Sequence, residues 1–264
     1  MQAARKAGAY LGSRFGTRPP VSYKGSPTNL VTEMDRGAEA IILQTIRHHF
    51  PGHSVLAEES GARTGTESHR WIVDPLDGTT NYAHGFPIYG VSIALEVEAV
   101  LEVGVVYDPS RGELFVAERG RGATLNGAPL RVSTTPRLLE SLLGTSYPND
   151  LRAAARDNLA EHTALMHRCR SVRSVGSAVL GLAAVAAGRL DGYWEQRLGP
   201  WDIAAGALLI REAGGTVTAV DGSPLDLTAP SITAANPLPA TTLIHTRLAC
   251  GSPTNQFTSR PIIT

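Results

Sequence analysis

The sequence predicts a mixed α/β protein in which helices and β-sheets are stacked in layers. Residues 88–133 form a series of β-rich runs separated by turn residues, a pattern that indicates an antiparallel meander. Residues 176–190 and 201–215 have a helical composition and are apolar almost all round. Because such helices are buried on more than one side, we expect them to pack on a sheet in the second half of the chain.

Composition and charge restrict the class of protein. The 264 residues are 42 % hydrophobic and 18 % charged, which is typical of a soluble globular protein with one large domain or two smaller ones. Lysine plus arginine equals aspartate plus glutamate at 24 each, so the net charge of zero argues against binding to nucleic acid or to an anionic membrane. No apolar run reaches the ~18 residues needed to cross a bilayer.

The cysteines and the first 16 residues indicate the cellular compartment to expect. Cys169 and Cys250 are far apart, and there is no Cys-x-x-Cys motif or His/Cys cluster, so neither a disulfide framework nor a structural zinc site is indicated. We expect two reduced thiols in a cytoplasmic protein. Residues 1–16 are rich in alanine and arginine and lack the apolar core of a signal peptide, so they predict an amphipathic first helix.

Helix and strand signals alternate in the residues before the meander. Thr32 and Asp35 resemble a capping box, and apolar residues then recur at helical spacing until Pro51–Gly52 ends the helix. Short strands are expected at 54–57 and 71–74. Each of these strands leads directly into acidic residues, which places carboxylates at strand ends.

Turn residues and a change in the residue pattern divide the rest of the chain. Hairpins are expected at 108–112 and at Asn126–Gly127. After residue 134 the β-rich pattern gives way to alternating helix and strand patterns. This change predicts an α+β domain at 1–140, an α/β domain at 141–250 and a flexible tail at 251–264. Beyond the meander we expect a helix at 151–168, strands at 171–175, 191–195 and 216–220, and the two apolar helices, the first with Ser177 as N-cap.

The most informative stretch is HRWIVDPLDGTTNYAHGFP, residues 69–87. A strand ends in Asp74 and Asp77, and Pro75 stiffens the step between them because its φ is fixed. The carbonyl of Leu76 lies between the two acids. These oxygens suit a hard cation, but an Asp-Pro turn followed by a helix cap explains the same residues.

A glycine and a helix start follow these acids immediately. Gly78 lets the backbone turn closely, and Thr79 begins a short helix whose free N–H groups could accept an anion. Acceptors for a cation next to donors for an anion suit a metal-bound phosphate. Taken alone, the stretch leaves this hypothesis and the turn-and-cap interpretation both open.

Further acids lie at strand ends and helix starts elsewhere in the chain. Glu58 and Glu59 close the strand at 54–57, Asp202 begins an apolar helix, and Glu195 follows an aromatic strand. Asp202 could instead be the N-cap of its helix, and Glu195 a solvent-facing charge. Carboxylates and a carbonyl without cysteine or histidine are the ligand set that Mg²⁺ prefers.

Several separated motifs, in the right order, resemble the signatures of the inositol monophosphatase family, within the lithium-sensitive, magnesium-dependent phosphatase superfamily. They are residues 24–35 (KGSPTNLVTEMD), the acidic pair 58–59, 71–87 and 201–215. The resemblance covers about residues 5–245. It implies a layered αβαβα sandwich with an N-terminal antiparallel sheet and two helices, followed by a C-terminal mixed sheet with flanking helices.

The resemblance also implies an activity and a set of ligands. The implied reaction is Mg²⁺-dependent hydrolysis of inositol monophosphate to inositol and phosphate by metal-activated water. Two or three Mg²⁺ ions are implied: the first at Glu58, Asp74 and the Leu76 carbonyl, the second at Asp74, Asp77 and Asp202, and a third through Glu58 and waters.

By the same resemblance, Thr79 paired with Asp35 orients the attacking water, with help from Glu58. The N–H groups of Gly78 and Thr79 are expected to bind the phosphate. The implied contacts to substrate hydroxyls are Asp77, Gly176, Ser177, Ala178 and Glu195. A small phosphorylated polyol or sugar is the expected partner, and the expected assembly is a homodimer.

Departures from the family pattern are small, and rival activities stay open. Asn29 stands where many members have Asp, and Tyr82 stands where Phe is common. Residues 80–82 (TNY) favour the inositol-type branch over phosphatases of histidinol phosphate or nucleotides, while sugar bisphosphates and NADP remain alternative substrates. A regulatory protein that keeps the fold and binds RNA machinery is the non-enzyme alternative.

Overall fold

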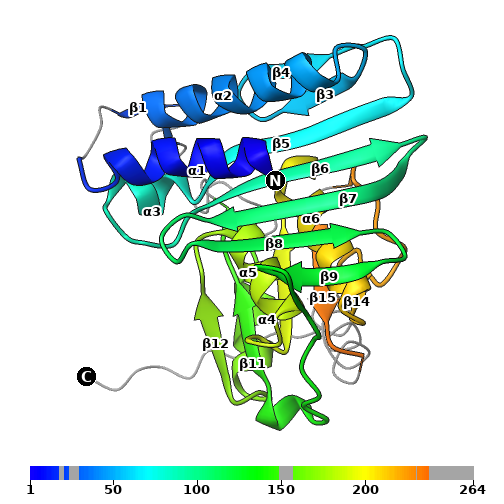
Figure 1. Cartoon of the computed structure of the whole chain (residues 1–264). Helices are drawn as coiled ribbons and strands as arrows, with labels where there is room; N and C mark the ends of the chain where they lie inside the picture. Colours follow the sequence, from blue (N-terminus) through cyan, green and yellow to red (C-terminus); the bar gives the residue numbers. More distant parts are fainter. Residues whose placement is uncertain (18–20, 24–29, 149–156, 230, 238–264) are drawn as a thin grey trace.

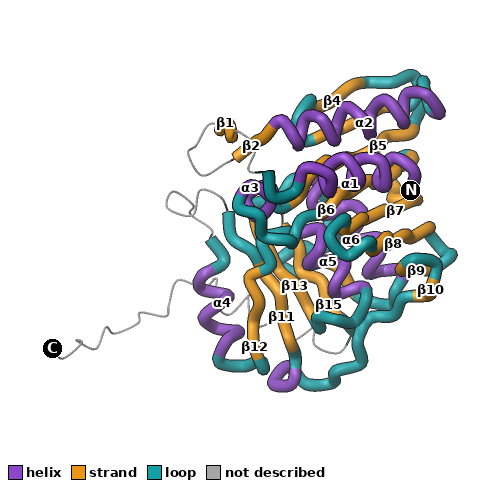
Figure 2. Tube along the Cα trace, turned by 60° about the vertical axis from the view of Figure 1, so that its left-hand side comes forward, coloured by secondary structure: helices purple, strands orange, loops and turns teal. Residues whose placement is uncertain are grey.

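The computed structural model describes residues 1–17, 21–23, 30–148, 157–229 and 231–237. Its elements form the expected αβαβα sandwich (Figure 1). Helices α1 (Gln2–Arg14) and α2 (Glu33–His49) cover one face of an eight-stranded sheet. Helices α5 (Ala178–Ala186) and α6 (Pro200–Glu212) lie between that sheet and a five-stranded one. Helix α4 (Leu159–Met166) lies on the outer side of the five-stranded sheet (Figure 2).

The eight-stranded sheet is antiparallel except for one pair. The meander predicted for residues 88–133 is confirmed, with both expected hairpin turns. Strands β3 and β5 are parallel, because the chain returns along the sheet edge as β4 before β5 begins. In sheet order the strands are β10 (Ala128–Pro129), β9 (Gly122–Leu125), β8 (Glu113–Glu118), β7 (Val100–Asp108), β6 (Gly90–Val97), β5 (His69–Asp77), β3 (Ser54–Ala57) and β4 (Gly61–Arg63).

The five-stranded sheet is mixed. Strand β11 is parallel to both of its neighbours, whereas β13, β15 and β14 pair antiparallel. Strand β15 was not among the strands expected from the sequence. The order is β12 (Ser171–Ser174), β11 (Leu142–Thr145), β13 (Gly192–Gln196), β15 (Ser231–Ala235) and β14 (Thr216–Thr218).

Smaller elements complete the described chain. A two-stranded ribbon leads into α2, the short helix α3 follows β5, and a 3₁₀ turn precedes β11: β1 (Val21–Tyr23), β2 (Leu30–Thr32), α3 (Thr79–Ala83) and η1 (Leu138–Glu140). The helix expected at 151–168 is shorter, since α4 begins at Leu159 after Asn158 adopts φ +67°. Residues 151–156, the predicted tail at 251–264 and Cys250 lie outside the described residues, and Cys169 is a buried free thiol. The division into domains at 1–140 and 141–250 stays a prediction.

Close contacts fix the start of α6 against the larger sheet. A Cβ on Gly104 of β7 would lie 2.8 Å from the carbonyl oxygen of Ala205, so only glycine allows the helix to approach this closely. The Ser92 hydroxyl of β6 donates a hydrogen bond of 2.9 Å to the carbonyl of Trp201. Both contacts hold Asp202, the next residue, beside the end of β5. Among the described helices, none has the length and apolar composition that a membrane crossing requires.

Candidate active site

A cleft of ≈ 330 Å³ lies where the end of β5 and the start of α3 meet the starts of α5 and α6 and the end of β13. All but one of the residues predicted for the site line it. These are Glu58, Asp74, Leu76, Asp77, Gly78, Thr79, Gly176, Ser177, Ala178, Glu195 and Asp202. The exception, Asp35, contacts the site through Thr79.

A β-bulge shapes the end of β5. Asp74 pairs with Ser92 and Asp77 pairs with Gly90, so three residue steps on β5 oppose two on β6. The extra residue falls at the Pro75–Leu76 step, where proline has no N–H to offer the ladder. The Leu76 N–H instead donates to Asp74 Oδ1 at 2.9 Å. The bulge therefore turns both aspartates toward the cleft.

Three aspartates converge at the floor of the cleft. Carboxylate oxygens of Asp74, Asp77 and Asp202 lie within 4.8 Å of one another. Burial, and then the negative charges of its neighbours, raises the pKa of Asp74 well above its usual range. Burial likewise raises the pKa of Asp202 well above its usual range, with Asp77 and Glu58 adding to the effect. A bound divalent cation would relieve this repulsion, so the arrangement fits an oxygen-ligated metal.

Glu58 and Leu76 supply further oxygens beside this group. Glu58 follows β3, lines the cleft, and its charge raises the pKa of both Asp74 and Asp202. Its backbone N–H donates to the Val73 carbonyl at 3.1 Å, which holds the residue against β5. The Leu76 carbonyl accepts from the Thr79 hydroxyl at 3.0 Å. The structure therefore brings Glu58 and Leu76 to the same cleft as the three aspartates.

Asp202 also has a structural role, although not the one considered from the sequence. The N-cap of α6 is Gly199, and Asp202 is the third residue of the helix. Its Oδ2 accepts a hydrogen bond of 2.5 Å from the Gly199 N–H. The N-cap assignment for Asp202 was therefore wrong by three residues. The reason is that Gly199-Pro200 begins the helix earlier than the periodicity indicates.

Asp35 joins the start of α2 to the cleft. The predicted capping box is confirmed, because Asp35 Oδ2 accepts from the Thr32 N–H at 2.7 Å and from the Thr32 hydroxyl at 2.6 Å. The other oxygen, Oδ1, accepts from the Thr79 hydroxyl at 2.9 Å. One buried carboxylate thus caps the helix and orients Thr79, 44 residues away in sequence.

Asp77 connects the larger sheet to α5. Its Oδ2 accepts a short hydrogen bond from the Ser177 hydroxyl and one of 2.8 Å from the Val179 N–H. Ser177 is the N-cap of α5, as predicted, with its hydroxyl accepting from the Leu180 N–H at 3.2 Å. Burial raises the pKa of Asp77 to about 6, although these hydrogen bonds favour its ionised form.

Glu195 is buried rather than exposed to solvent at its strand end. Only 5 % of its surface is accessible, so the alternative of a solvent-facing charge was wrong. The Tyr193 hydroxyl makes a short hydrogen bond to Glu195 Oε2 and also contacts Ser146 Oγ at 3.2 Å. Burial raises the pKa of Glu195 well above its usual range. This burial arises from the tertiary fold, and no local signal in the sequence reveals it.

Sequence reasoning missed part of the cleft wall. Tyr147 and Pro148 follow β11, Ser174 is the last residue of β12, and Arg197 and Leu198 follow β13. The Asn81 side chain joins this wall to α3 by donating to the Gly176 carbonyl at 3.2 Å. The signal that could have indicated these residues is the topology of the sheet, because the ends of parallel strands meet at one edge of a sheet.

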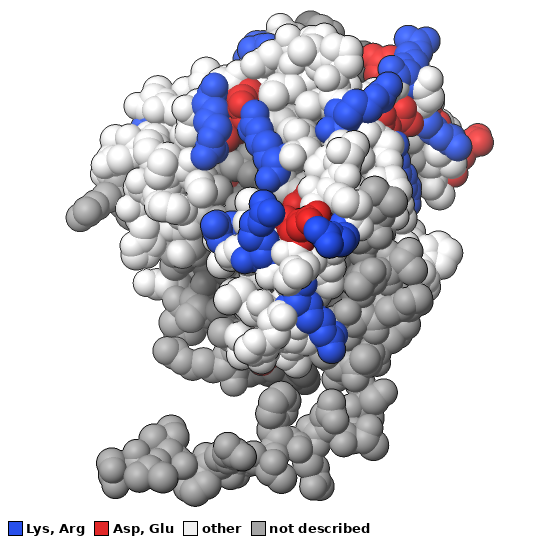
Figure 3. Space-filling model, turned by 90° about the horizontal axis from the view of Figure 1, so that it is seen from below, with Lys and Arg blue, Asp and Glu red and all other residues white. Residues whose placement is uncertain are grey.

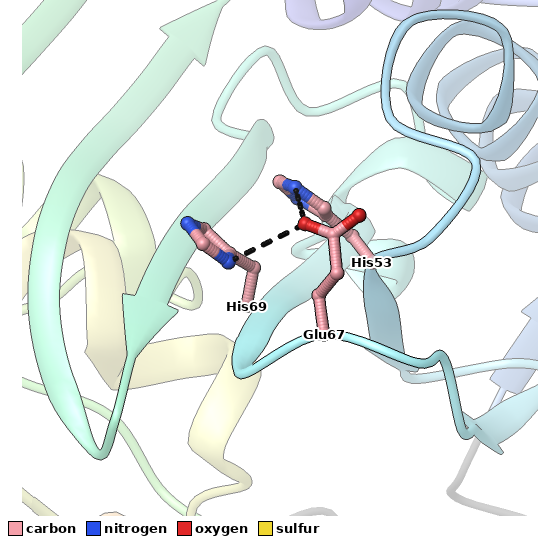
Figure 4. A group of neighbouring side chains, drawn as sticks. All are labelled: His53, Glu67 and His69. Carbon is pink, nitrogen blue, oxygen red and sulfur yellow. Dashed lines mark ion pairs between the residues drawn. The ribbon is translucent and has the colours of Figure 1, made fainter.

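A second group of potential ligands lies at the opposite end of β5 (Figure 4). Glu67 Oε2 lies 3.3 Å from His53 Nε2 and 3.7 Å from His69 Nδ1. The Trp71 indole donates to His53 Nδ1 at 3.0 Å, which leaves the neutral ring's proton on Nε2, facing Glu67. A cation would need the lone pair of that nitrogen. Hydrogen bonding within a ring stack therefore explains this group better than a metal does.

Comparisons with known proteins identify a family for this chain. A sequence model of the inositol monophosphatase family matches residues 1–252. An inositol-1-monophosphatase from Synechocystis sp. is 48 % identical over 236 residues, which cover 89 % of this chain and 82 % of the relative. A Nus factor SuhB from Escherichia coli is 45 % identical over 240 residues and is covered to 90 %, as is this chain.

A solved structure supports the same relationship. The inositol monophosphatase from Anabaena (Nostoc) sp. superposes with a TM-score of 0.85 at 44 % identity. The match covers 94 % of this chain and 93 % of that one. The layered fold is therefore shared with proteins of known structure.

Proposed function

The chain belongs to the inositol monophosphatase family, and on that premise we propose that it is a Mg²⁺-dependent phosphomonoesterase that releases phosphate and inositol from inositol monophosphate. The observation that carries the proposal is the convergence of Asp74, Asp77 and Asp202 at the floor of a cleft, beside a threonine hydroxyl held by a buried carboxylate. The proposal includes inhibition by Li⁺, a homodimeric assembly and a cytoplasmic location, all of which rest on the family resemblance.

The residues that would hold two or three Mg²⁺ ions are Asp74, Asp77, Asp202, Glu58 and the carbonyl of Leu76. When bound, such ions neutralise charge on the phosphoryl oxygens, lower the pKa of a water molecule and stabilise the leaving oxygen. No cysteine, serine or histidine nucleophile is required.

Thr79 is proposed to hold the attacking water. Its hydroxyl has one proton and two acceptors, Asp35 Oδ1 at 2.9 Å and the Leu76 carbonyl at 3.0 Å. Donation to Asp35 leaves the Leu76 carbonyl available as a ligand. The lone pairs of Thr79 Oγ1 can then accept a hydrogen bond from water, so the water's own oxygen points toward phosphorus.

Backbone N–H groups and buried carboxyls are proposed to bind the substrate. Gly78 has φ +84°, and a Cβ there would lie 2.8 Å from the Ile88 carbonyl oxygen, so a glycine is required where the chain turns. The N–H groups of Gly78 and Thr79 would donate to phosphate oxygens. Glu195 and residues 176–178 would bind the inositol hydroxyls, since polar groups left unmatched in a site cost about 1–3 kcal/mol.

Surface charge favours a small substrate over a nucleic acid. The net charge is zero, and on the face seen in Figure 3 the basic side chains lie beside acidic ones. Ion pairs such as Arg121–Glu118 and Arg119–Glu102 neutralise part of the charge on the described surface. The relative named Nus factor SuhB supports the second candidate, a regulatory protein that keeps the fold and binds RNA machinery, which an inactive purified protein would favour.

A phosphomonoester panel tests the proposal. The purified protein is assayed for phosphate release from inositol 1-phosphate, fructose 1,6-bisphosphate, NADP and histidinol phosphate, with Mg²⁺ and with EDTA. We expect inositol 1-phosphate to be the preferred substrate, activity only with Mg²⁺, and inhibition by Li⁺. Loss of that activity in Asp74→Asn would place it in this cleft. Release from no substrate, or full activity of Asp74→Asn, would refute the proposal.

A further inference from the structure

A chain of hydrogen bonds joins two parts of the cleft that are proposed to bind substrate hydroxyls. The Gly176 N–H donates to Ser146 Oγ at 3.0 Å, and the hydroxyl oxygens of Ser146 and Tyr193 lie 3.2 Å apart. The Tyr193 hydroxyl in turn makes its short hydrogen bond to Glu195 Oε2. The chain therefore runs from the segment before α5, through the residue that follows β11, to the end of β13.

The two hydroxyl groups have one proton each, which fixes the direction of donation along the chain. Burial raises the pKa of the Tyr193 hydroxyl well above its usual range, so this group keeps its proton and donates it to the Glu195 carboxylate. The bond between the two hydroxyls then has Ser146 as its donor, and Ser146 accepts from Gly176. Every donor in the chain therefore points toward the carboxylate.

The ring of Tyr193 is fixed by its surroundings. The side chain is fully buried in the core between the two sheets. A Cβ on Gly181 of α5 would overlap the ring, and one on Gly144 of β11 would lie 2.9 Å from it. Because glycines let the helix and the neighbouring strand approach this closely, the ring has little space in which to move, and its hydroxyl is held in one place.

Tyr193 controls which oxygen of Glu195 is left for a substrate. Glu195 lines the cleft, and its Oε2 is held by the tyrosine. Among the described residues, none donates a hydrogen bond to the other oxygen, Oε1. Burial raises the pKa of Glu195, and the hydrogen bond from Tyr193 opposes that rise. The tyrosine therefore both orients the carboxylate and favours the ionised form, which accepts from a hydroxyl group.

From this arrangement we propose that Tyr193 is a positioning residue for substrate specificity, which holds Glu195 so that Oε1 accepts from a substrate hydroxyl and thereby favours phosphorylated polyols over phosphomonoesters without hydroxyl groups. The inference rests on the proposed phosphatase activity. A carboxylate that is already held in one rotamer loses little conformational freedom when a substrate binds, so more of the binding energy is retained. A carboxylate without this hydrogen bond would have to be ordered by the substrate itself.

Two ring compounds and a double-mutant cycle test the proposal. Inositol 1-phosphate and cyclohexyl phosphate share a six-membered carbon ring, but only the first carries hydroxyl groups. For the wild type, Tyr193→Phe, Glu195→Ala and the double variant, kcat and KM are measured on inositol 1-phosphate. Cyclohexyl phosphate is added as a competitive inhibitor, so its affinity is measured without its turnover. The matched control is Tyr82→Phe, which removes another buried tyrosine hydroxyl, one that donates to the Leu11 carbonyl at 2.7 Å outside the cleft.

The expected result is a loss of affinity for the polyol alone. In Tyr193→Phe, kcat/KM for inositol 1-phosphate should fall about tenfold, mainly through KM, while the inhibition constant of cyclohexyl phosphate stays within about twofold of the wild-type value. In the Glu195→Ala background the same substitution should change kcat/KM by less than about twofold, because the carboxylate that it positions is gone. Tyr82→Phe should leave both constants unchanged, although thermal unfolding should show a similar loss of stability in the two tyrosine variants.

Three results would overturn this inference alone. They are a wild-type KM in Tyr193→Phe, an equal loss of affinity for both ring compounds, and losses that add in the double variant. A wild type that releases no phosphate from inositol 1-phosphate overturns the proposed function, and this inference with it.

Discussion

The two walls of the cleft are built in different ways. The wall formed by the larger sheet holds its polar groups through short local hydrogen bonds, such as Leu76 N–H to Asp74 and Thr79 hydroxyl to the Leu76 carbonyl. The opposite wall depends on contacts between distant segments, such as Asn81 with Gly176 and Tyr193 with Ser146. The first wall supplies most of the acids, and the second supplies Glu195 and Arg197.

This difference suggests that chemistry and substrate choice can be altered separately. Substitutions on the first wall should change the rate with every substrate, because they act at the aspartates. Substitutions on the second wall should change the relative rates among substrates. Asp77 is the exception, because it belongs to the first wall and is hydrogen bonded to Ser177 and Val179 of the second.

The largest expected effect is therefore that of Asp77→Ala. Loss of a metal ligand should reduce kcat/KM at least about 1,000-fold, since metal ions supply several kcal/mol of charge stabilisation. Loss of the acceptor for Ser177 and Val179 should also lower the free energy of unfolding, measured with urea in EDTA, by about 1–2 kcal/mol.

The matched variant is Asp74→Asn, whose side chain keeps an oxygen acceptor for the Leu76 N–H. It should be as inactive as Asp77→Ala and yet, without metal, at least as stable as the wild type, because a buried repulsive charge has been removed. If Asp77→Ala proved as stable as Asp74→Asn in EDTA, Asp77 would not connect the two walls.

The next effect is that of Thr79→Val, a substitution confined to the first wall. Valine has nearly the same shape but cannot donate to Asp35 or accept from water. We expect kcat to fall about 100-fold with every substrate, with KM little changed, because a side chain positioned to assist proton transfer from the attacking group contributes about 10²–10⁴-fold. Thr79→Ser, which keeps the hydroxyl, should retain most of the activity. Equal kcat values for Thr79→Val and the wild type would leave Thr79 with only a structural role.

Much of the first wall could be predicted from the sequence, and the reasons are local. Strand, proline, aspartates and glycine are consecutive in residues 71–79, so their mutual placement needs only a few dihedral angles. The capping box of Thr32 with Asp35 and the N-cap Ser177 are recognised for the same reason. The hydrogen bonds of Asp35 to Thr79 and of Ser177 to Asp77 could not be predicted in this way, because they form only in the tertiary fold.

The second wall was less accessible to sequence reasoning. Glu195 is buried by segments far away in the chain, and the left-handed conformation of Arg197 is rare for any residue with a Cβ. Strand β15 is a short segment that forms a strand because it pairs with both β13 and β14. In each case long-range contacts decide the outcome, and no periodicity or turn signal encodes them.

A smaller effect concerns pH and metal removal. The pKa of Asp77 is raised to about 6 from 3.8, so between these values the folded protein binds more protons than the unfolded chain. Without metal, the free energy of unfolding should therefore fall as the pH rises through 6, by on the order of 2 kcal/mol.

Thermal unfolding at pH 5 and pH 7.5, in EDTA and in Mg²⁺, measures this dependence. Mg²⁺ should stabilise the protein more at pH 7.5 than at pH 5, since cations bind the ionised carboxylates. The Asp77→Asn variant, which cannot titrate, is the control and should show a weaker pH dependence in EDTA. A metal-free protein that is more stable at pH 7.5 than at pH 5 would contradict the assigned effect of burial on the Asp77 carboxyl.

The smallest expected effect tests whether helix α2 helps to fix the position of Glu58 in the first wall. Glu39 of α2 is buried, and its Oε2 accepts from the Glu59 N–H at 2.9 Å, which fixes the turn that carries Glu58. Glu39→Leu removes the acceptor, whereas Glu39→Gln keeps it. We expect the Mg²⁺ concentration for half-maximal activity, and for half-maximal thermal stabilisation, to rise about tenfold in Glu39→Leu, because residues that orient metal ligands typically contribute 10–100-fold to affinity. Glu39→Gln should remain within about threefold of the wild type by the same reasoning. If both variants shift equally, the charge of Glu39 matters rather than its hydrogen bond, and if neither shifts, the turn holds Glu58 without help from α2.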